Sequence, residues 1–201
     1  QASADVLLAL INDILDFCRI EAGKVDLDPV DFDLDDFLSE LSRALACQAH
    51  QKGLELILSI DPEVPTRLCG DSLRLREIII NLAGNAIKFT EKGEVEIAVS
   101  VESEDEETVL LRFTVRDTGI GIAQDQIPFL FDAFFQGDSS IKRKYGGTGL
   151  GLAISKRLVN CMGGKLSFTS EAGNGSEFRF VVPFRNVVRD CEPPVLPADW
   201  H

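Results

Sequence analysis

One long helix with a polar stripe constrains this chain more than any other feature. Residues 71–90 (DSLRLREIIINLAGNAIKFT) predict a helix that Asp71 caps. At about 100° per residue, five polar residues fall in one narrow stripe of this helix, namely Arg74, Glu77, Asn81, Asn85 and Lys88. Apolar residues flank the stripe on both sides, with Leu75, Ile78, Ile79, Leu82, Ala86 and Phe89 on one side and Leu73, Ile80 and Ile87 on the other. Such a stripe is not the ordinary solvent face of a surface helix.

The two asparagines of this stripe allow two interpretations, and the helix alone leaves both open. Asparagine is a mediocre helix former, so Asn81 and Asn85, one turn apart, have a local cost. They are either buried carboxamides that neighbouring backbone satisfies or part of a ligand site. In a ligand site, a carboxamide oxygen suits Mg²⁺, which bridges phosphates. Lys88, a turn further on, would add a point charge for those phosphates.

Two glycine-rich motifs follow the helix. The first is DTGIGI, residues 117–122, at the end of an expected strand; its carboxylate could accept from an amino group while the glycines allow a flat ligand close approach. The second is GGTGLGL, residues 146–152, which opens another amphipathic helix and so presents free N–H groups to an anion. It lacks the Gly-Lys-Ser/Thr of a P-loop, and it follows a loop and not the strand of a Rossmann turn.

Composition excludes several function classes. The net charge of −13 argues against a nucleic-acid-binding surface, so a polyanionic ligand must be held by local amides, local cations or a metal. Five scattered cysteines fit a reducing compartment better than a disulfide framework or a zinc site. No apolar run is long enough to span a bilayer, and we expect a cytoplasmic domain, which a membrane-bound sensor could carry.

Helical and strand-like segments are mixed along the chain, which predicts the α/β class. Besides the long helix, we expect helices at residues 4–21, 35–51 and 149–162, and a short one at 124–131. Strands are expected at residues 54–60, 94–101, 108–116, 165–170 and 176–183, with an edge strand near 25–34. Residues from 186 onward contain three prolines and no periodicity, which is typical of a tail or linker.

Three motifs in this order resemble the N box and the two glycine boxes of sensor histidine kinases, close to the hybrid kinases with extra phosphorelay domains. They are NLAGNAIKFT (81–90), DTGIGI (117–122) and GGTGLGLAIS (146–155), and FDAFFQ (131–136) resembles the F box. The resemblance implies a Bergerat-type two-layer α/β sandwich with a mixed sheet, preceded by one helix of a dimerisation hairpin. It divides the chain into that helix (1–24), an ATP-binding kinase domain (25–185) and a tail or linker (186–201).

The resemblance also implies a site for ATP and Mg²⁺. Asn85 would be the Mg²⁺ ligand, Asn81 its phosphate-side neighbour, and Lys88 a phosphate contact, so that Asn85 and Lys88 take the catalytic roles. Phe89 would pack near the nucleoside, and Asp117 would accept from the adenine amino group beside Gly119, Gly121 and Ile122. The phosphate cradle would comprise Gly147, Thr148, Gly149, Leu150, Gly151 and Leu152, below a mobile lid that supplies Lys142, Arg143 and Lys144 as cations.

The implied partners are ATP or ADP, a histidine-bearing dimerisation helix, a response-regulator receiver domain and a second copy of the full-length protein. Residues 11–24 (INDILDFCRIEAGK) resemble the second helix of the dimerisation hairpin, whose first helix carries the phosphoacceptor. Neither His50 nor His201 fits that acceptor, because His50 follows the hairpin helix and His201 ends the chain. We therefore expect a fragment or an engineered truncation, with the acceptor histidine outside this chain.

Two other functions compete with the kinase, and both keep the nucleotide. Sensor histidine kinases share a superfamily with gyrase-type topoisomerases, heat-shock chaperone ATPases and DNA mismatch-repair ATPases. The ATPases of this superfamily carry a water-activating glutamate one turn before the metal asparagine, but this position is Asn81, and a carboxamide is no general base. Glu77 is two turns from Asn85, about 12 Å along the axis, which is too far for that role. A non-catalytic nucleotide-sensing module would be expected to have a damaged box, and every box is intact. The sequence thus favours phosphotransfer to histidine.

Overall fold

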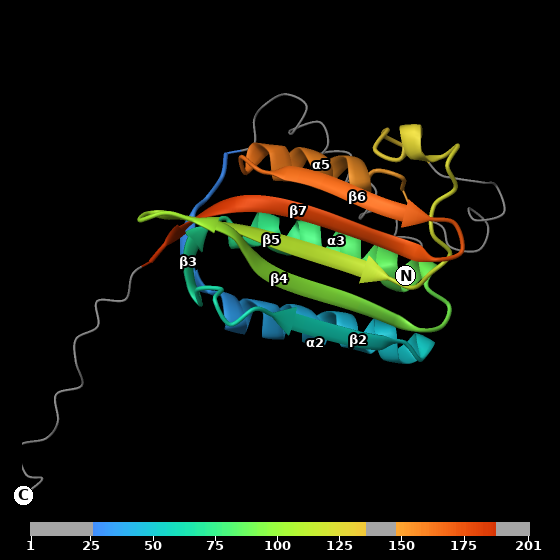
Figure 1. Cartoon of the computed structure of the whole chain (residues 1–201), viewed down its shortest axis with the longest axis horizontal. Coiled ribbons are helices and arrows are strands. Elements are labelled where there is room, and N and C mark those ends of the chain that lie inside the picture. The colour runs from blue at the N-terminus through green and yellow to red at the C-terminus, as the bar shows by residue number, and fades with distance from the viewer. Residues whose placement is uncertain (1–25, 136–147, 188–201) are drawn as a thin grey trace, which may run out of the picture.

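A mixed sheet with helices on one face makes up the part of the chain that the computed structural model describes, residues 26–135 and 148–187 (Figure 1). The strands are β1 (Val30–Asp33), β2 (Glu55–Ile60), β3 (Arg67–Gly70), β4 (Glu94–Glu104), β5 (Thr108–Asp117), β6 (Lys165–Glu171) and β7 (Gly175–Asn186). The seven-stranded sheet has the order β1-β3-β7-β5-β4-β2, and β6 pairs with β7. β2 and β4 are parallel, whereas the other pairs are antiparallel. The predicted α/β sandwich with a mixed sheet is confirmed.

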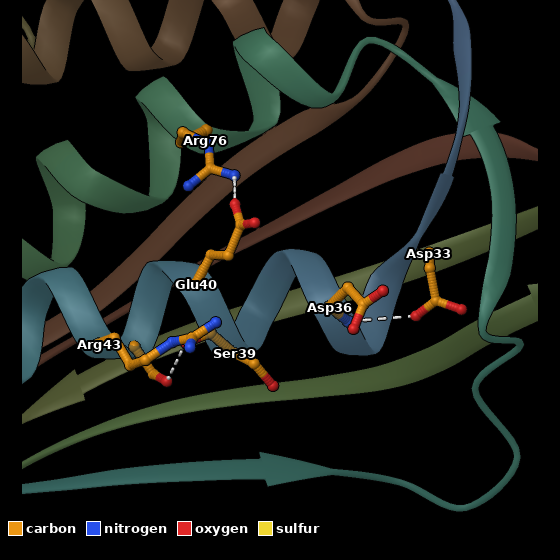
Figure 2. Close-up of polar contacts among 7 residues, drawn as sticks. Asp33, Asp36, Ser39, Glu40, Arg43 and Arg76 are labelled. Atoms are coloured by element: carbon orange, nitrogen blue, oxygen red, sulfur yellow. Dashed lines mark hydrogen bonds and ion pairs between the residues drawn. The ribbon is translucent and has the colours of Figure 1, made fainter.

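The helices are α2 (Leu34–Lys52), α3 (Ser72–Phe89) and α5 (Gly151–Cys161), and they lie behind the sheet in Figure 1. α2 begins where the Asp33 carboxylate accepts from the amides of Asp35 and Asp36, and it ends at Gly53, whose φ of 71° is left-handed. An ion pair of 3.0 Å between Arg76 and Glu40 joins α3 to α2 on the solvent side (Figure 2).

The core lies between the helices and the alternate residues of the strands that face them. In β5, Val109, Leu111, Phe113 and Val115 are almost fully buried, while the residues between them are not. They pack against the buried stripes of α2 and α3, which include Leu38, Leu41, Leu75 and Ile79. This rigid two-layer packing fixes the positions of α3 and of the end of β5.

The structure differs from the sequence expectations at short elements. β3 was not predicted, because only two apolar residues stand in RLCG and they do not alternate; its pairing with β1 and β7 makes it a strand. Instead of a helix over 124–131, the chain forms a 3-10 turn, Ile127–Phe129, with Pro128 in it. The expected helix at 4–21, the stretch 136–147 and the tail beyond 187 lie outside the described residues. Within the described ranges, no helix is long and apolar enough to cross a membrane.

Candidate functional site

A cavity of about 820 Å³ opens on the helical side of the sheet. Its walls come from α3, from the turn after β5, from the segment 126–135 and from the start of α5. Its volume is in the range typical of sites for small organic molecules, roughly 300–1,000 Å³. A nucleotide-sized ligand would therefore fit between α3 and α5.

The polar stripe of α3 lines this cavity along its whole length. One apolar flank, with Ile78 and Ile79, is buried in the core. On the other flank, Leu73 is 67% exposed and Ile80 is 41% exposed, and both belong to the cavity wall. The stripe is thus exposed to the cavity because one side of α3 lies in the core and the other side, except for the buried Ile87, lies at the cavity rim.

Asn81 and Asn85 form a hydrogen-bonded chain that continues into α5. Asn81 Nδ2 donates to the hydroxyl of Ser155 at 2.7 Å, and Asn85 Nδ2 donates to Asn81 Oδ1 at 3.4 Å. Ser155 is only 1% exposed. Among the described residues, the hydrogen-bond partners of these carboxamides are side chains, which argues against the alternative in which neighbouring backbone satisfies them.

The oxygen of Asn85 is what would suit a metal ion. Within the described residues, no group donates a hydrogen bond to Asn85 Oδ1, because the bond from Asn85 to Asn81 uses Nδ2. No cluster of three or more His, Cys, Asp or Glu occurs in the same ranges. A cation here would therefore take one protein oxygen and complete its shell with water and phosphate oxygens, which is the mode that Mg²⁺ favours. The residues present fit such an ion.

Asp117 borders the cavity where β5 ends, and the turn after it packs against the end of α3. The side chain is 7% exposed and accepts from the backbone amide of Gly119 at 2.8 Å. Burial raises the pKa of this carboxyl above its usual value, and hydrogen bonds from the amides of Gly119 and Ser176 oppose part of that rise. The site therefore holds a nearly dry acceptor that a ligand amino group could satisfy.

The glycines after Asp117 are required by close packing. A Cβ on Gly119 would lie 2.6 Å from the carbonyl oxygen of Phe89. Gly121 has a left-handed φ of 64°, and a Cβ there would collide with the carbonyl of Glu171. The turn thus packs against the end of α3 on one side and β6 on the other, which fixes the position of Asp117.

The start of α5 supplies free backbone donors. Its N-cap residue is Leu150, which has no side-chain acceptor, and the Leu150 amide itself donates to Thr148 Oγ1 at 3.1 Å. Among the described residues, no group accepts from the amides of the first turn, Gly151 to Ala153, and the positive end of the helix dipole lies beside them. An anionic ligand is what this end of the cavity suits.

Lys88 is the cation of the α3 stripe. Its Nζ lies 5.0 Å from the centre of the Phe89 ring. Burial lowers the pKa of Lys88 from its usual value, because desolvation disfavours the ammonium form. A phosphate at this position would offset that cost.

The structure brings most of the predicted site residues to this one cavity. They are Asn81, Asn85, Lys88, Phe89, Asp117, Gly121, Ile122, Thr148, Gly149, Gly151 and Leu152. Gly119 lies just behind Asp117, while Leu150 is fully buried in the core and does not line the cavity. Lys142, Arg143, Lys144 and Gly147 lie outside the described residues.

Sequence reasoning missed several residues of the site. Ser155 and Ser176 contact Asn81 and Asp117 respectively, and Gln126, Phe135 and Ile120 also line the cavity. One signal was available for Ser155, because it is four residues after Gly151 and shares its helix face. Ser176 offered no comparable signal, because it reaches Asp117 only through the pairing of β5 with β7.

The sequence match covers this site. Residues 70–186, which include every described residue of the cavity wall, match the family described as histidine kinase-, DNA gyrase B- and HSP90-like ATPases. The chain belongs to this family. Within the histidine kinase-, gyrase- and HSP90-like ATPases, this chain is an ATP-binding catalytic domain of the two-component kinase type.

Relatives of known name support that placement within the family. The chain is 46% identical over 200 residues to the sensor histidine kinase GacS of Pseudomonas protegens, and 50% identical over 180 residues to the signal transduction histidine-protein kinase BarA of Escherichia coli. These alignments cover 98% and 90% of this chain, but only 22% and 20% of the relatives. The chain thus spans about a fifth of the length of these relatives.

Solved structures of other family members have the same fold. Full-length ShkA, solved in complex with AMPPNP, superposes with a TM-score of 0.80 at 39% identity, over 93% of this chain and 38% of ShkA. The histidine kinase AdeS of Acinetobacter baumannii superposes with a TM-score of 0.69 at 23% identity, over 89% of this chain and 79% of AdeS. At that identity, AdeS supports the fold alone.

Proposed function

We propose that this domain binds ATP with Mg²⁺ and transfers the γ-phosphate to a histidine on a dimerisation helix. The observation that carries the proposal is the arrangement of groups around one cavity. Asp117 is a buried acceptor beside the C-terminal end of α3, where Gly119 packs against Phe89, while Gly151 at the start of α5 packs against Asn81, about two turns earlier on α3. The cavity thus offers an acceptor to an adenine amino group and, further along α3, backbone donors to a phosphate chain.

The assigned roles follow from the chemistry of each group. Asp117 accepts from the adenine amino group, and the turn with Gly119, Gly121 and Ile122 lets the ring approach. Phe89 packs near the nucleoside, and Lys88 contacts phosphate. The phosphate cradle consists of Thr148, Gly149, Gly151 and Leu152, with Leu150 buried in the core behind them. Gly147 of the same cradle, and the lid cations Lys142, Arg143 and Lys144, lie outside the described residues.

A Mg²⁺ ion on Asn85 would neutralise charge on the phosphates as transfer proceeds. In the transfer, a ring nitrogen of the acceptor histidine forms a bond to the γ-phosphorus. The bond from that phosphorus to the β,γ-bridging oxygen breaks, and ADP leaves with the electron pair. The residues of this domain hold the phosphates in line for that attack, and positioning is most of what such a reaction needs.

Transfer fits the site better than hydrolysis by an ATPase. One turn before Asn85, the site has the Asn81 carboxamide, which bonds to Ser155 and cannot take a proton from water. The nearest carboxylate along the stripe, Glu77, pairs with Arg74 at 2.8 Å. Slow ATP hydrolysis is therefore expected. A non-catalytic nucleotide sensor would bind equally well, and only the transfer assay below separates it from a kinase.

The acceptor in this proposal is neither histidine of the chain. His50 is exposed on the last turn of α2 and does not line the cavity. We assign residues 1–24 to the second helix of the dimerisation hairpin, 25–185 to the kinase domain and 186–201 to a tail. The full-length protein would be a cytoplasmic or membrane-anchored homodimer that passes phosphate to a receiver domain.

The test of transfer supplies the acceptor. A hairpin helix with its histidine, fused ahead of Gln1, should become labelled by radioactive ATP with Mg²⁺, and the label should be acid-labile and base-stable. The matched control is the same fusion with that histidine changed to glutamine, which should remain unlabelled. Label on His50 of the unfused chain, or no label on a fusion that binds ATP, would contradict the proposal.

The test of the metal assignment is Asn85→Ala. Calorimetry should show that Mg²⁺ tightens ADP binding to the natural chain, and that this gain is lost in the variant while metal-free binding persists. A folded variant with an unchanged gain would refute Asn85 as the ligand.

A further inference from the structure

A polar contact joins the two helices that flank the cavity, because Ser155 of α5 accepts a hydrogen bond from Asn81 of α3. The hydroxyl of Ser155 accepts from Asn81 Nδ2 at 2.7 Å and is almost fully buried. Gly151, one turn earlier on α5, faces the same carboxamide, and a Cβ at Gly151 would collide with it. The Asn81 side chain is therefore held between the backbone of Gly151 and the hydroxyl of Ser155.

This contact decides which atom Asn85 offers to the cavity. Asn81 donates to Ser155 through its Nδ2, so its Oδ1 faces Asn85. This Oδ1 accepts a hydrogen bond from Asn85 Nδ2 at 3.4 Å. The nitrogen and oxygen of a carboxamide are on opposite sides of its terminal carbon, so Asn85 Oδ1 is turned away from Asn81. If the Asn81 amide lost the Ser155 hydroxyl as its acceptor, the Asn81 side chain could rotate. The Asn85 side chain would then lose its fixed orientation.

We propose that Ser155 is a positioning residue that acts through Asn81 to orient the Asn85 oxygen for the metal ion and to tie that oxygen to the phosphate-binding end of α5. The proposal rests on the proposed function. It assigns to Asn81 a supporting role and not direct contact with phosphate. Because the bond joins α3 to α5, it also sets the spacing between the metal ligand and the free amides that begin at Gly151.

A purely structural role for Ser155 would have a different signature. A buried hydroxyl that only satisfies a neighbour would, when removed, weaken folding and nucleotide binding alike, with or without metal. An orienting role should instead appear in the part of the affinity that Mg²⁺ adds. The ratio of ADP affinities with Mg²⁺ and with a chelator separates the two roles.

The experiment measures that ratio by calorimetry for the natural chain, Ser155→Ala, Asn81→Ala and the double variant. The lost hydrogen bond should reduce the Mg²⁺-dependent gain of Ser155→Ala by about 2- to 13-fold. Affinity in chelator should stay within about 2-fold. Asn81→Ala should show the same selective loss, and Ser155→Ala should add nothing to it, because the serine acts through the asparagine.

The matched control is Val159→Ala, one turn further along α5. Val159 is fully buried in the core and has no bond to Asn81, so its truncation should lower the melting temperature and leave the metal ratio unchanged. Nuclear magnetic resonance of the side-chain amides in nucleotide-free protein gives a second readout. The Asn81 and Asn85 signals should shift in Ser155→Ala and not in Val159→Ala.

Three results would overturn the proposal. They are an unchanged ratio in Ser155→Ala, an equal loss with and without metal, or effects of the two single variants that add in the double variant. If the natural chain bound ADP without any gain from Mg²⁺, the proposed function would itself fail in its metal assignment, and this inference would fail with it. If the natural chain shows the Mg²⁺-dependent gain, Asn85→Ala loses it and Ser155→Ala keeps it, this inference fails while the proposed function stands.

Discussion

Replacement of Asp117 by asparagine should weaken nucleotide binding without weakening the fold. Asparagine keeps the shape of the side chain and one oxygen as an acceptor for the Gly119 amide, which donates to the carboxylate of the natural chain at 2.8 Å. It puts a donor where the second carboxylate oxygen was, opposite the position proposed for the adenine amino group. A hydrogen bond to a charged group contributes about 1.5–3 kcal/mol, so the affinity for ADP should fall about 13- to 160-fold.

The free energy of unfolding of Asp117→Asn should not fall, because burial raises the pKa of Asp117 in the folded natural chain. A raised carboxyl pKa favours folding below the unfolded pKa, and that contribution is lost as the pH rises through the folded pKa. At neutral pH the buried charge therefore opposes folding. Asp117→Asn should melt at a temperature no lower than that of the natural chain. The affinity ratio of the two proteins should shrink as the pH is lowered, since the natural carboxyl then becomes neutral.

Asp105→Asn is the matched control at the opposite end of the β4–β5 hairpin. Asp105 also accepts from two backbone amides, of Glu107 at 3.0 Å and Thr108 at 2.8 Å, but it is exposed and far from the cavity. These bonds lower the pKa of Asp105, so its contribution to stability is present above the unfolded pKa and is lost as the pH falls through the folded pKa. Calorimetry with ADP in chelator, together with melting curves, compares the variants. Equal ADP affinity in folded Asp117→Asn would refute the assignment of the adenine acceptor.

Three further changes test the frame around the site. Gly121→Ala should destabilise the chain by more than about 1 kcal/mol in urea unfolding, because φ is left-handed and the Glu171 carbonyl blocks the new methyl group; an unchanged midpoint would contradict the packing of this turn. Leu41→Ala removes a fully buried side chain of α2 and should cost about 2–5 kcal/mol, with unchanged ADP affinity below the melting temperature. Lys52→Met should lower the melting temperature, because the Lys52 ammonium donates to three carbonyls at the end of α3, including that of Thr90 at 3.2 Å; a melting temperature equal to that of the natural chain would show that these bonds add nothing.

The elements with a strong local signal could be predicted from the sequence. The long helix shows a stripe of period 3.6 over its whole length, and Asp71 does cap it by accepting from the Arg74 amide. The strands with alternating burial, such as β5, were found for the same reason, although the structure extends β5 to Asp117. The polar groups of the α3 stripe and Asp117 were also found, because each stands in a short motif whose chemistry is unusual for its element.

The sequence by itself determined the longer helices and strands and the residues that carry charge and hydrogen bonds at the site, because those signals lie within a few residues of one another. Only the tertiary structure decided which residues distant in the sequence contact one another. Ser155 and Asn81 are 74 residues apart and become partners because α3 and α5 pack on the same face of the sheet. Leu150 stands inside a glycine motif, yet the packing of α5 buries it in the core. Hydrogen-bond partners, and the burial of a single residue such as Leu150, depend on neighbours through space, and no periodicity along the chain encodes them.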